Sequence, residues 1–262
     1  MEAVEGKGST ASKGNPVNDI WTVLGLALLP ALGNFAGGLL AERFPVSQRQ
    51  LNLALHAAAG VVLAVVAVEL MPEALAAISG WTVALAFGMG GLAYVAIESL
   101  VDRLQGDDQR QGGASLGMWM IFVAVSVDLF SDGLMIGTGS SVSTALALTL
   151  ALGQVMADVP EGYATIANMK DKGIPRSRRL LLSASFALPA LVAAALAYYL
   201  LRDQADIWKM GMLALTAGLL TVAAVEDMLS EAHESAEDHR SSVLAFVGGF
   251  VLFTLVSAGL GS

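Results

Sequence analysis

Four carboxylic acids stand inside long apolar stretches of the sequence, where an ionisable side chain is costly. Asp128 and Asp132 have i, i+4 spacing, and Asp158 and Glu161 have i, i+3 spacing, so each pair lies on one face of a helix. Placing such a group at membrane depth costs ~2.5–3.5 kcal/mol on insertion scales. No Lys or Arg stands within either stretch to neutralise the acids. A bound divalent cation would remove their mutual repulsion, and carboxylate oxygens are good ligands for such cations.

The residues around these acids suit the same chemistry. Gln154 precedes Asp158 by one helical turn and shares its face. Pro160 removes one backbone hydrogen bond and frees a carbonyl about a turn earlier. Gly133 and Gly162 each follow an acid directly and permit close helix approach. We expect a metal site formed by Asp128, Asp132, Asp158, Glu161 and Gln154. The alternative is that the acids are protonated structural groups, or that they lie nearer to a membrane interface.

The composition predicts an all-α polytopic membrane protein. Of 262 residues, 55% are hydrophobic and only 14% are charged, with a mean hydropathy of +0.66, whereas soluble domains carry about 25% charged residues. Apolar runs of roughly 20 residues span a bilayer core as helices. The net charge of −9 argues against a nucleic-acid partner, and the absence of Cys excludes disulfides and thiolate metal sites. Residues 1–18 are polar and predict a disordered tail, and 19–262 predict a single transmembrane domain.

The apolar stretches predict eight transmembrane helices. They cover residues 20–41, 50–76, 81–101, 114–137, 144–169, 179–201, 207–232 and 241–260. A polar loop at 102–113 follows the third helix, and an uncharged turn at 137–143 predicts a tight hairpin between the fourth and fifth. Ten of the 14 Lys and Arg residues fall in the loops after the odd-numbered helices, which predicts that these loops face the cytoplasm and that both termini lie outside.

An internal repeat is also predicted. The second helix ends in Ala67–Ala74 (AVELMPEA), and the seventh ends in the similar Ala224–Ala232 (AVEDMLSEA). This match favours a 3+2+3 arrangement, in which helices 1–3 and 6–8 are repeats around a central 4–5 hairpin. Equivalent helices are then five apart, and an odd offset inverts their direction, as in many transporters.

The segments Asp128–Gly133 (DLFSDG) and Ala157–Gly162 (ADVPEG) resemble two motifs of the ZIP (Zrt/Irt-like) family of metal transporters. The family has His-Asn-x-x-Glu/Asp-Gly in its fourth helix and His-Asn/Asp/Glu-x-Pro-Glu-Gly in its fifth. The resemblance implies eight helices, a binuclear metal centre whose bridging acids are Asp132 and Glu161, and an elevator-like motion.

This sequence departs from the family pattern at several ligand positions, as expected of a divergent, prokaryotic-type member. Ala157 and Leu129 replace ligands, and Leu188 stands where the family often has a glutamate. We therefore expect a single metal rather than two. An oxygen-only site suits manganese and iron(II), so these rank beside the family's zinc, with cobalt and cadmium also considered. No organic cofactor is expected.

Other acidic and histidine residues are weaker candidates. The resemblance places Glu226 and Asp227, with Glu231 nearby, on a cytoplasmic exit route, although they could simply be solvated. Glu69 and Glu73, near the outer end of the second helix, could attract cations to the entrance. His233 and His239 could capture metal in a cytoplasmic loop. His56 is interpreted as a packing residue.

The sequence therefore predicts transport of divalent metal ions into the cytoplasm, and no enzyme activity, since it shows no nucleophile–base constellation. Two alternatives stay open: a non-transporting ZIP-like sensor or scaffold, and a proton-coupled transporter of another substrate. The expected partners are metal ions and the lipid bilayer, with a homodimer as an open alternative to the monomer. The expected location is the inner (plasma) membrane of a prokaryote.

Overall fold

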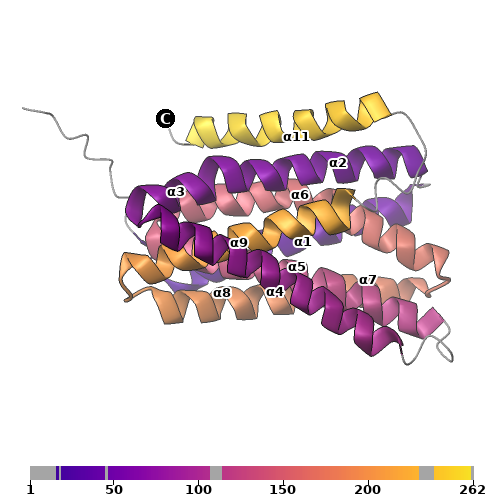
Figure 1. Cartoon of the computed structure of the whole chain (residues 1–262). Helices are drawn as coiled ribbons and strands as arrows, with labels where there is room; N and C mark the ends of the chain where they lie inside the picture. The colour runs from indigo at the N-terminus through magenta and orange to yellow at the C-terminus, as the bar shows by residue number, and fades with distance from the viewer. Residues whose placement is uncertain (1–15, 18, 45–46, 107–113, 230–238, 261–262) are drawn as a thin grey trace, which may run out of the picture.

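The computed structural model describes residues 16–17, 19–44, 47–106, 114–229 and 239–260. All regular structure in these ranges is helical, and the helices pack lengthwise into one bundle (Figure 1). In chain order they are α1 (Ile20–Arg43), α2 (Gln48–Ala64), η1 (Val65–Leu70), α3 (Met71–Ala77), α4 (Gly80–Gly106), α5 (Ala114–Val142), α6 (Thr144–Asp171), α7 (Arg176–Ser185), α8 (Ala187–Leu201), α9 (Asp206–Ala223), η2 (Ala224–Leu229) and α11 (His239–Leu260).

Seven of these helical stretches are long and apolar enough to cross a membrane, which confirms the predicted class of fold. α2, η1 and α3 together form one of them, as do α7 and α8. The predicted fifth helix corresponds to α6, which has 28 residues but is not among the seven. Its apolar surface is interrupted by Gln154, Asp158, Pro160 and Glu161. α6 contacts α1, α2 and α5, so neighbouring helices cover these polar groups.

Two predicted connections are shorter than expected. α4 continues to Gly106, into the predicted polar loop, and α5 continues to Val142, through most of the predicted turn. The hydroxyl groups in that turn donate to carbonyls of their own helix, as Thr138 does to Leu134 and Ser140 to Ile136. Ser143 then caps α6 by accepting from the Leu146 amide. Polar residues that bond back to their own helix can extend it, and composition alone does not reveal this.

Three predicted continuous helices are interrupted. The sixth predicted helix divides at Phe186 into α7 and α8, because Pro189 cannot donate a hydrogen bond to the carbonyl of Ser185. The second and seventh predicted helices each contain a π-helical turn, η1 and η2. The first turn includes the predicted accessory acid Glu69, and the second includes Glu226 and Asp227. Such turns are frequent at functional sites.

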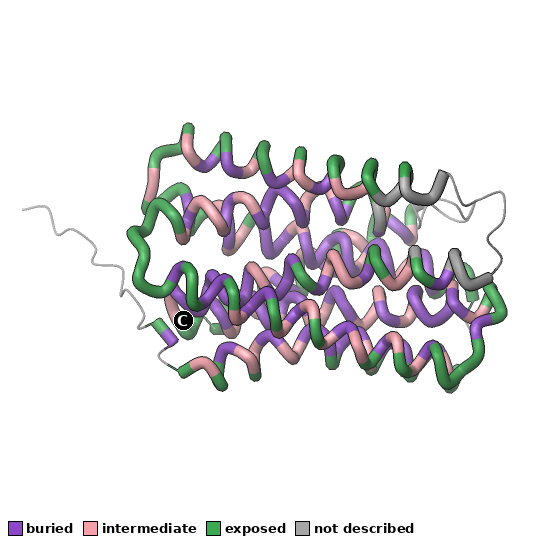
Figure 2. The backbone as a smooth tube through the Cα atoms, turned by 90° about the horizontal axis from the view of Figure 1, so that it is seen from below, coloured by how far each residue is buried: buried purple, intermediate pink, exposed green. Residues whose placement is uncertain are grey.

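The helices pack in two groups. α1, α5, α6, α7 and α8 contact one another in the first group, and α2, α4, α9 and α11 form the second, in which α2 pairs with α11 and α4 with α9. The groups meet where α2 contacts α6 and where α5 contacts α9. Figure 2 shows that the buried residues concentrate on the inner faces of the helices, and α11 lies at the edge of the bundle beside α2 (Figure 1).

Glycines allow four of these helix pairs to approach closely. At the α1–α6 crossing, a Cβ on Gly162 would collide with the carbonyl oxygen of Asn34, and one on Gly37 would collide with that of Val159. Backbone-to-backbone contact of this kind requires glycine. The corresponding glycines in the other pairs are Gly133 and Gly137 for α5–α8, Gly60 and Gly249 for α2–α11, and Gly90 and Gly218 for α4–α9.

Polar contacts fix both ends of the first group of helices. At one end, Arg179 of α7 donates to the buried carboxylate of Glu42 in α1, with an Nε–Oε1 distance of 2.6 Å. At the other end, Val17 donates to the carbonyl of Ser140, and the Tyr198 hydroxyl donates to the Val17 carbonyl. Val17 falls within the predicted N-terminal tail, yet it is buried. Residues 1–15 of that tail lie outside the described residues.

Candidate metal centre

Three of the predicted ligands converge between α5 and α6. Asp128, Asp158 and Glu161 each offer a carboxylate oxygen, and these oxygens lie within 4.8 Å of one another. Asp158 is fully buried, whereas Asp128 and Glu161 are partly accessible. The helical spacing brings Asp158 and Glu161 to one face of α6, and the α5–α6 hairpin brings that face to Asp128. Oxygens at this separation can contact a single divalent ion together.

Asp132 and Gln154 lie beside this group. The side-chain amide of Gln154 donates to Oδ1 of Asp132, and both residues are buried. Asp132 also interacts electrostatically with Asp128 and Asp158. All five predicted site residues are therefore neighbours, but Asp132 is held by the glutamine and is not one of the three converging carboxylates.

Several oxygens at this position are buried without a hydrogen-bond donor. They are Oδ2 of Asp132, both carboxylate oxygens of Asp158 and the Oε1 atom of Gln154. Burying an acceptor without a donor is unfavourable, and burying a charge unpaired is more so. A cation coordinated by these atoms would satisfy several of them at once. This donor set consists only of oxygen, which suits hard divalent ions.

Sequence reasoning missed two residues near the acids. Asn34 of α1 is fully buried, and its Nδ2 lies 3.3 Å from Oε2 of Glu161. Glu98 of α4 lines a cavity of about 80 Å³ that also contains Asp128. The available signals were an amide within the first apolar stretch and an acid within the third. The sequence of neither stretch indicates which other helix Asn34 or Glu98 would face.

The cavity beside Asp128 lies between α4, α5 and α9, where the two helix groups meet. Its lining is otherwise apolar: Tyr94, Ile97, Val123, Ala124, Val127 and Leu219. Glu98 and Asp128 are thus the two acids of this cavity. The cavity therefore lies between Asp128, one of the converging carboxylates, and helices α4 and α9 of the second group.

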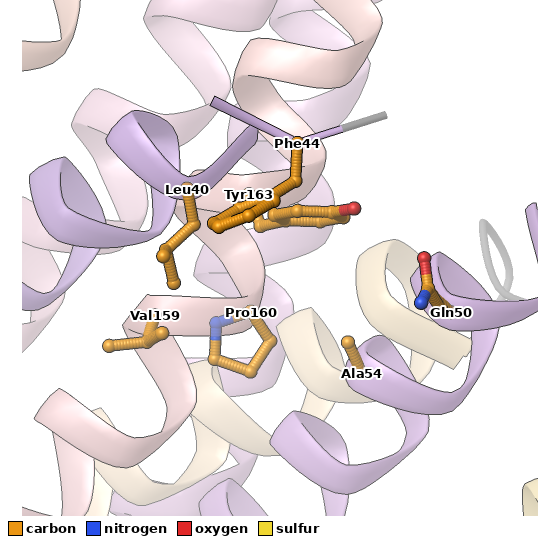
Figure 3. Close-up of a pocket in the computed structure, with 7 residues that line it drawn as sticks. All are labelled: Leu40, Phe44, Gln50, Ala54, Val159, Pro160 and Tyr163. Carbon is orange, nitrogen blue, oxygen red and sulfur yellow. The ribbon is translucent and has the colours of Figure 1, made fainter. Parts of the chain in front are cut away.

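A second hollow approaches α6 from the other side. Figure 3 shows this groove of about 540 Å³ between α1, α2 and α6. Val159 and Pro160, which lie between Asp158 and Glu161 in the chain, form part of its wall, and Gln50 faces it from α2. The remaining lining residues are Leu40, Phe44, Ala54 and Tyr163. The groove therefore reaches the part of α6 that carries Pro160 and the acids.

The three departures from the family motifs have different surroundings. Ala157 and Leu129 are fully buried and apolar, so neither adds a ligand beside the acids. Leu188 is 63% exposed and points away from the core. The expectation of a reduced ligand set is consistent with these positions.

Among the described accessory residues, none belongs to the three converging carboxylates. Glu69 accepts a hydrogen bond from Ser257 of α11, and Glu73 is exposed. Glu226 is exposed in η2. His56 is buried, and its Nδ1 lies 2.9 Å from the Asn52 carbonyl. Glu231 and His233, and the side chains of Asp227 and His239, lie outside the described residues.

A bundle of helices long and apolar enough to cross a membrane, enclosing a cluster of carboxylates and amides, defines an integral membrane protein. The sequence profile of the ZIP zinc transporter family matches residues 103–257, which is more than half of the chain. The protein belongs to this family.

Known family members are similar to more than half of the chain. Zinc transporter ZIP10 of Mus musculus is 27% identical over 154 residues, which are 57% of this chain and 18% of that protein. Zinc transporter ZIP6 of Homo sapiens is 26% identical over 141 residues, which are 53% of this chain and 18% of that protein. The matched part thus amounts to less than a fifth of these relatives' length.

Proposed function

We propose that the protein transports divalent metal cations across the membrane into the cytoplasm through the site between α5 and α6. The observation that carries the proposal is the convergence of Asp128, Asp158 and Glu161, whose oxygens lie within 4.8 Å of one another. Asp132 and Gln154 complete the proposed site. Family membership supports metal transport as the general activity.

The proposed substrate is a divalent ion with a preference for oxygen ligands. The central residues offer carboxylate and amide oxygens, with no histidine or thiolate among them. Such a ligand set favours manganese or iron(II) at least as much as zinc. The proposed selectivity is relaxed, so that cobalt and cadmium would also be carried. The relatives are named as zinc transporters, so zinc remains among the proposed substrates.

The proposed path runs from the outer side to the cytoplasm. Glu69 and Glu73 would attract cations at the entrance, and the ion would then lose water to the central carboxylates. Its way out would pass the cavity shared by Asp128 and Glu98, and then Glu226 and Asp227. The loop histidines His233 and His239 would capture it weakly. A membrane potential assists this direction by about 2.3 kcal/mol per charge per 100 mV.

We also propose the 3+2+3 plan with inverted repeats. Under that plan α1 corresponds to α7–α8, the α2–η1–α3 stretch to α9–η2, α4 to α11, and α5 to α6. The α1–α6 and α5–α8 packings are then equivalent, as are α2–α11 and α4–α9. The π-helical turns also fall at corresponding glutamates. An elevator-like motion would slide the first helix group, which carries the site, against the second.

The test is metal uptake into proteoliposomes with the purified full chain. Wild type should take up manganese, iron(II) or zinc, and Asp132→Ala and Glu161→Ala should each lose nearly all uptake. Asp203→Ala, which removes an exposed acid in the loop between α8 and α9, is the matched control and should transport as wild type does.

The same assay separates the rival functions. Folded wild type that binds metal but moves none would indicate a sensor or scaffold, which the loss of ligands at Ala157 and Leu129 would then explain. Substrate movement that depends on pH but not on metal would indicate a proton-coupled transporter. Uptake unchanged in both acid variants would refute the proposed site.

A further inference from the structure

Asn34 brings a third helix, α1, to the group of acids between α5 and α6. Its side chain is fully buried at the α1–α6 crossing. Gly162 makes this position possible, because any Cβ there would overlap the Asn34 backbone. The residue before that glycine is Glu161, and the Asn34 amide donates to it across 3.3 Å. The closest approach of α1 to α6 is therefore beside a proposed ligand.

The other atom of this amide has no partner. Oδ1 of Asn34 is buried and accepts no hydrogen bond from any described residue. An amide is normally buried with both its donor and its acceptor satisfied. The Asn34 side-chain nitrogen donates to the Glu161 carboxylate, whereas the Asn34 oxygen is buried nearby without a donor.

Gln154 shows the same arrangement on α6. Its nitrogen donates to Asp132, and its Oε1 atom is buried without a donor. Two amides on two helices thus each hold one acid through nitrogen and leave one oxygen unpaired. Hydrogen bonds to the acids orient both amides, and a cation is the ligand that would satisfy their oxygens together with those of Asp158.

We propose that Asn34 is a metal-binding residue of this site, supplying its amide oxygen to the ion as a neutral ligand from α1. The inference rests on the proposed function and deepens it. A neutral oxygen raises the coordination number towards the six or more that hard divalent ions prefer, without adding negative charge to an already acidic interior. It also makes α1 part of the binding site, so that the ion links α1 to the α5–α6 hairpin.

The test is equilibrium binding of Mn²⁺ to the purified full chain in detergent, followed by the electron paramagnetic resonance signal of free Mn²⁺. Asn34→Leu keeps the volume and removes the oxygen, and it should weaken binding by about tenfold or more, as loss of a ligand or of its supporting partner does. Asn34→Asp keeps the oxygen but cannot donate to Glu161, and it should bind within about threefold of wild type or more tightly.

Ser183→Ala is the matched control. Its hydroxyl is also buried without a partner and faces α1 near Gly38, but it is not one of the proposed ligands. It should leave Mn²⁺ affinity unchanged. Unfolding temperatures measured without metal would show that each variant is folded.

Two results would overturn the assignment of Asn34. Asn34→Leu with wild-type affinity would show that the oxygen is not used, and Asn34→Asp as weak as Asn34→Leu would show that only the donated hydrogen bond matters. Asp158→Ala separates this failure from that of the proposed function. If wild type bound no Mn²⁺, or bound it equally without Asp158, the proposed site itself would be wrong.

Discussion

Each acid at the metal centre has different neighbours, although all four occur in apolar helices. Asp132 is held by Gln154, and Glu161 is held by Asn34. No described side chain donates to Asp158, which is fully buried, while Asp128 faces a cavity that it shares with Glu98. Under the proposed function, these surroundings would make Asp158 the acid that depends most on a bound cation and Asp128 the one nearest to a cavity.

Replacing Asp158 with asparagine should stabilise the metal-free protein and abolish its response to metal. The change removes one buried carboxylate from a group that repels itself in the absence of a cation. The unfolding temperature without metal should rise, by roughly 2–4 °C per kcal/mol gained. Differential scanning fluorimetry in detergent measures it.

Added Mn²⁺ should separate wild type from Asp158→Asn. At 100 times the dissociation constant, a ligand stabilises a protein by about 2.7 kcal/mol, so wild type should melt roughly 5–10 °C higher. Asp158→Asn should show little shift, and the exposed control Asp203→Asn should behave as wild type does. A wild-type shift retained in Asp158→Asn would contradict the proposed role of this carboxylate.

The helices are positioned by glycine contacts more than by their amphipathic character. α1 and α6 touch backbone to backbone at Gly37 and Gly162, and this crossing places Asn34 against Glu161. Pro160 lies in the same turn of α6 and faces the groove shown in Figure 3. The close packing and the proposed ligand Glu161 therefore share one short segment of α6, so a change in the packing should affect the proposed site.

Gly162→Ala should force α1 away from α6. The added Cβ would meet backbone atoms of Asn34, which cannot rotate away as a side chain can. We expect a loss of about 1–3 kcal/mol in stability and weaker Mn²⁺ binding, measured by thermal unfolding and by titration. Gly25→Ala, on α1 with open space around its Cβ position, should change neither quantity. Equal behaviour of both variants would show that the crossing tolerates separation.

At the scale of the whole molecule, the proposed site lies within one of the two helix groups. The first group contains the converging acids, and the second borders it where α2, η1 and α11 contact α6 and where α9 contacts α5. Both hollows near the acids lie along these boundaries. A relative displacement of the groups would therefore alter access to the site without breaking the interior of either group.

The predicted orientation can be tested because the chain contains no cysteine. Lys172 and Gln204 are both exposed and lie in connections at opposite ends of the bundle, after α6 and after α8. In intact cells, a membrane-impermeant maleimide should label Gln204→Cys and leave Lys172→Cys unlabelled until the membrane is opened. The opposite labelling would reverse the orientation and the proposed direction of transport.

The sequence by itself determined the helical class, most helix positions and the pairing of acids on α5 and α6. Hydrophobic run length and helical periodicity are properties of a single segment, so they can be read without knowing its neighbours. The motif resemblance likewise depended on local spacing, as at Asp158 and Glu161.

Only the tertiary structure decided which faces meet. It placed Asn34 on Glu161, brought Glu98 to the cavity of Asp128, and joined Asp132 to Gln154 beside the three converging carboxylates. It also extended α5 through the predicted turn, where hydroxyls bond back to their own helix. The physical reason is that periodicity fixes the face on which a residue lies, whereas the partner of that face depends on contacts between segments far apart in the chain.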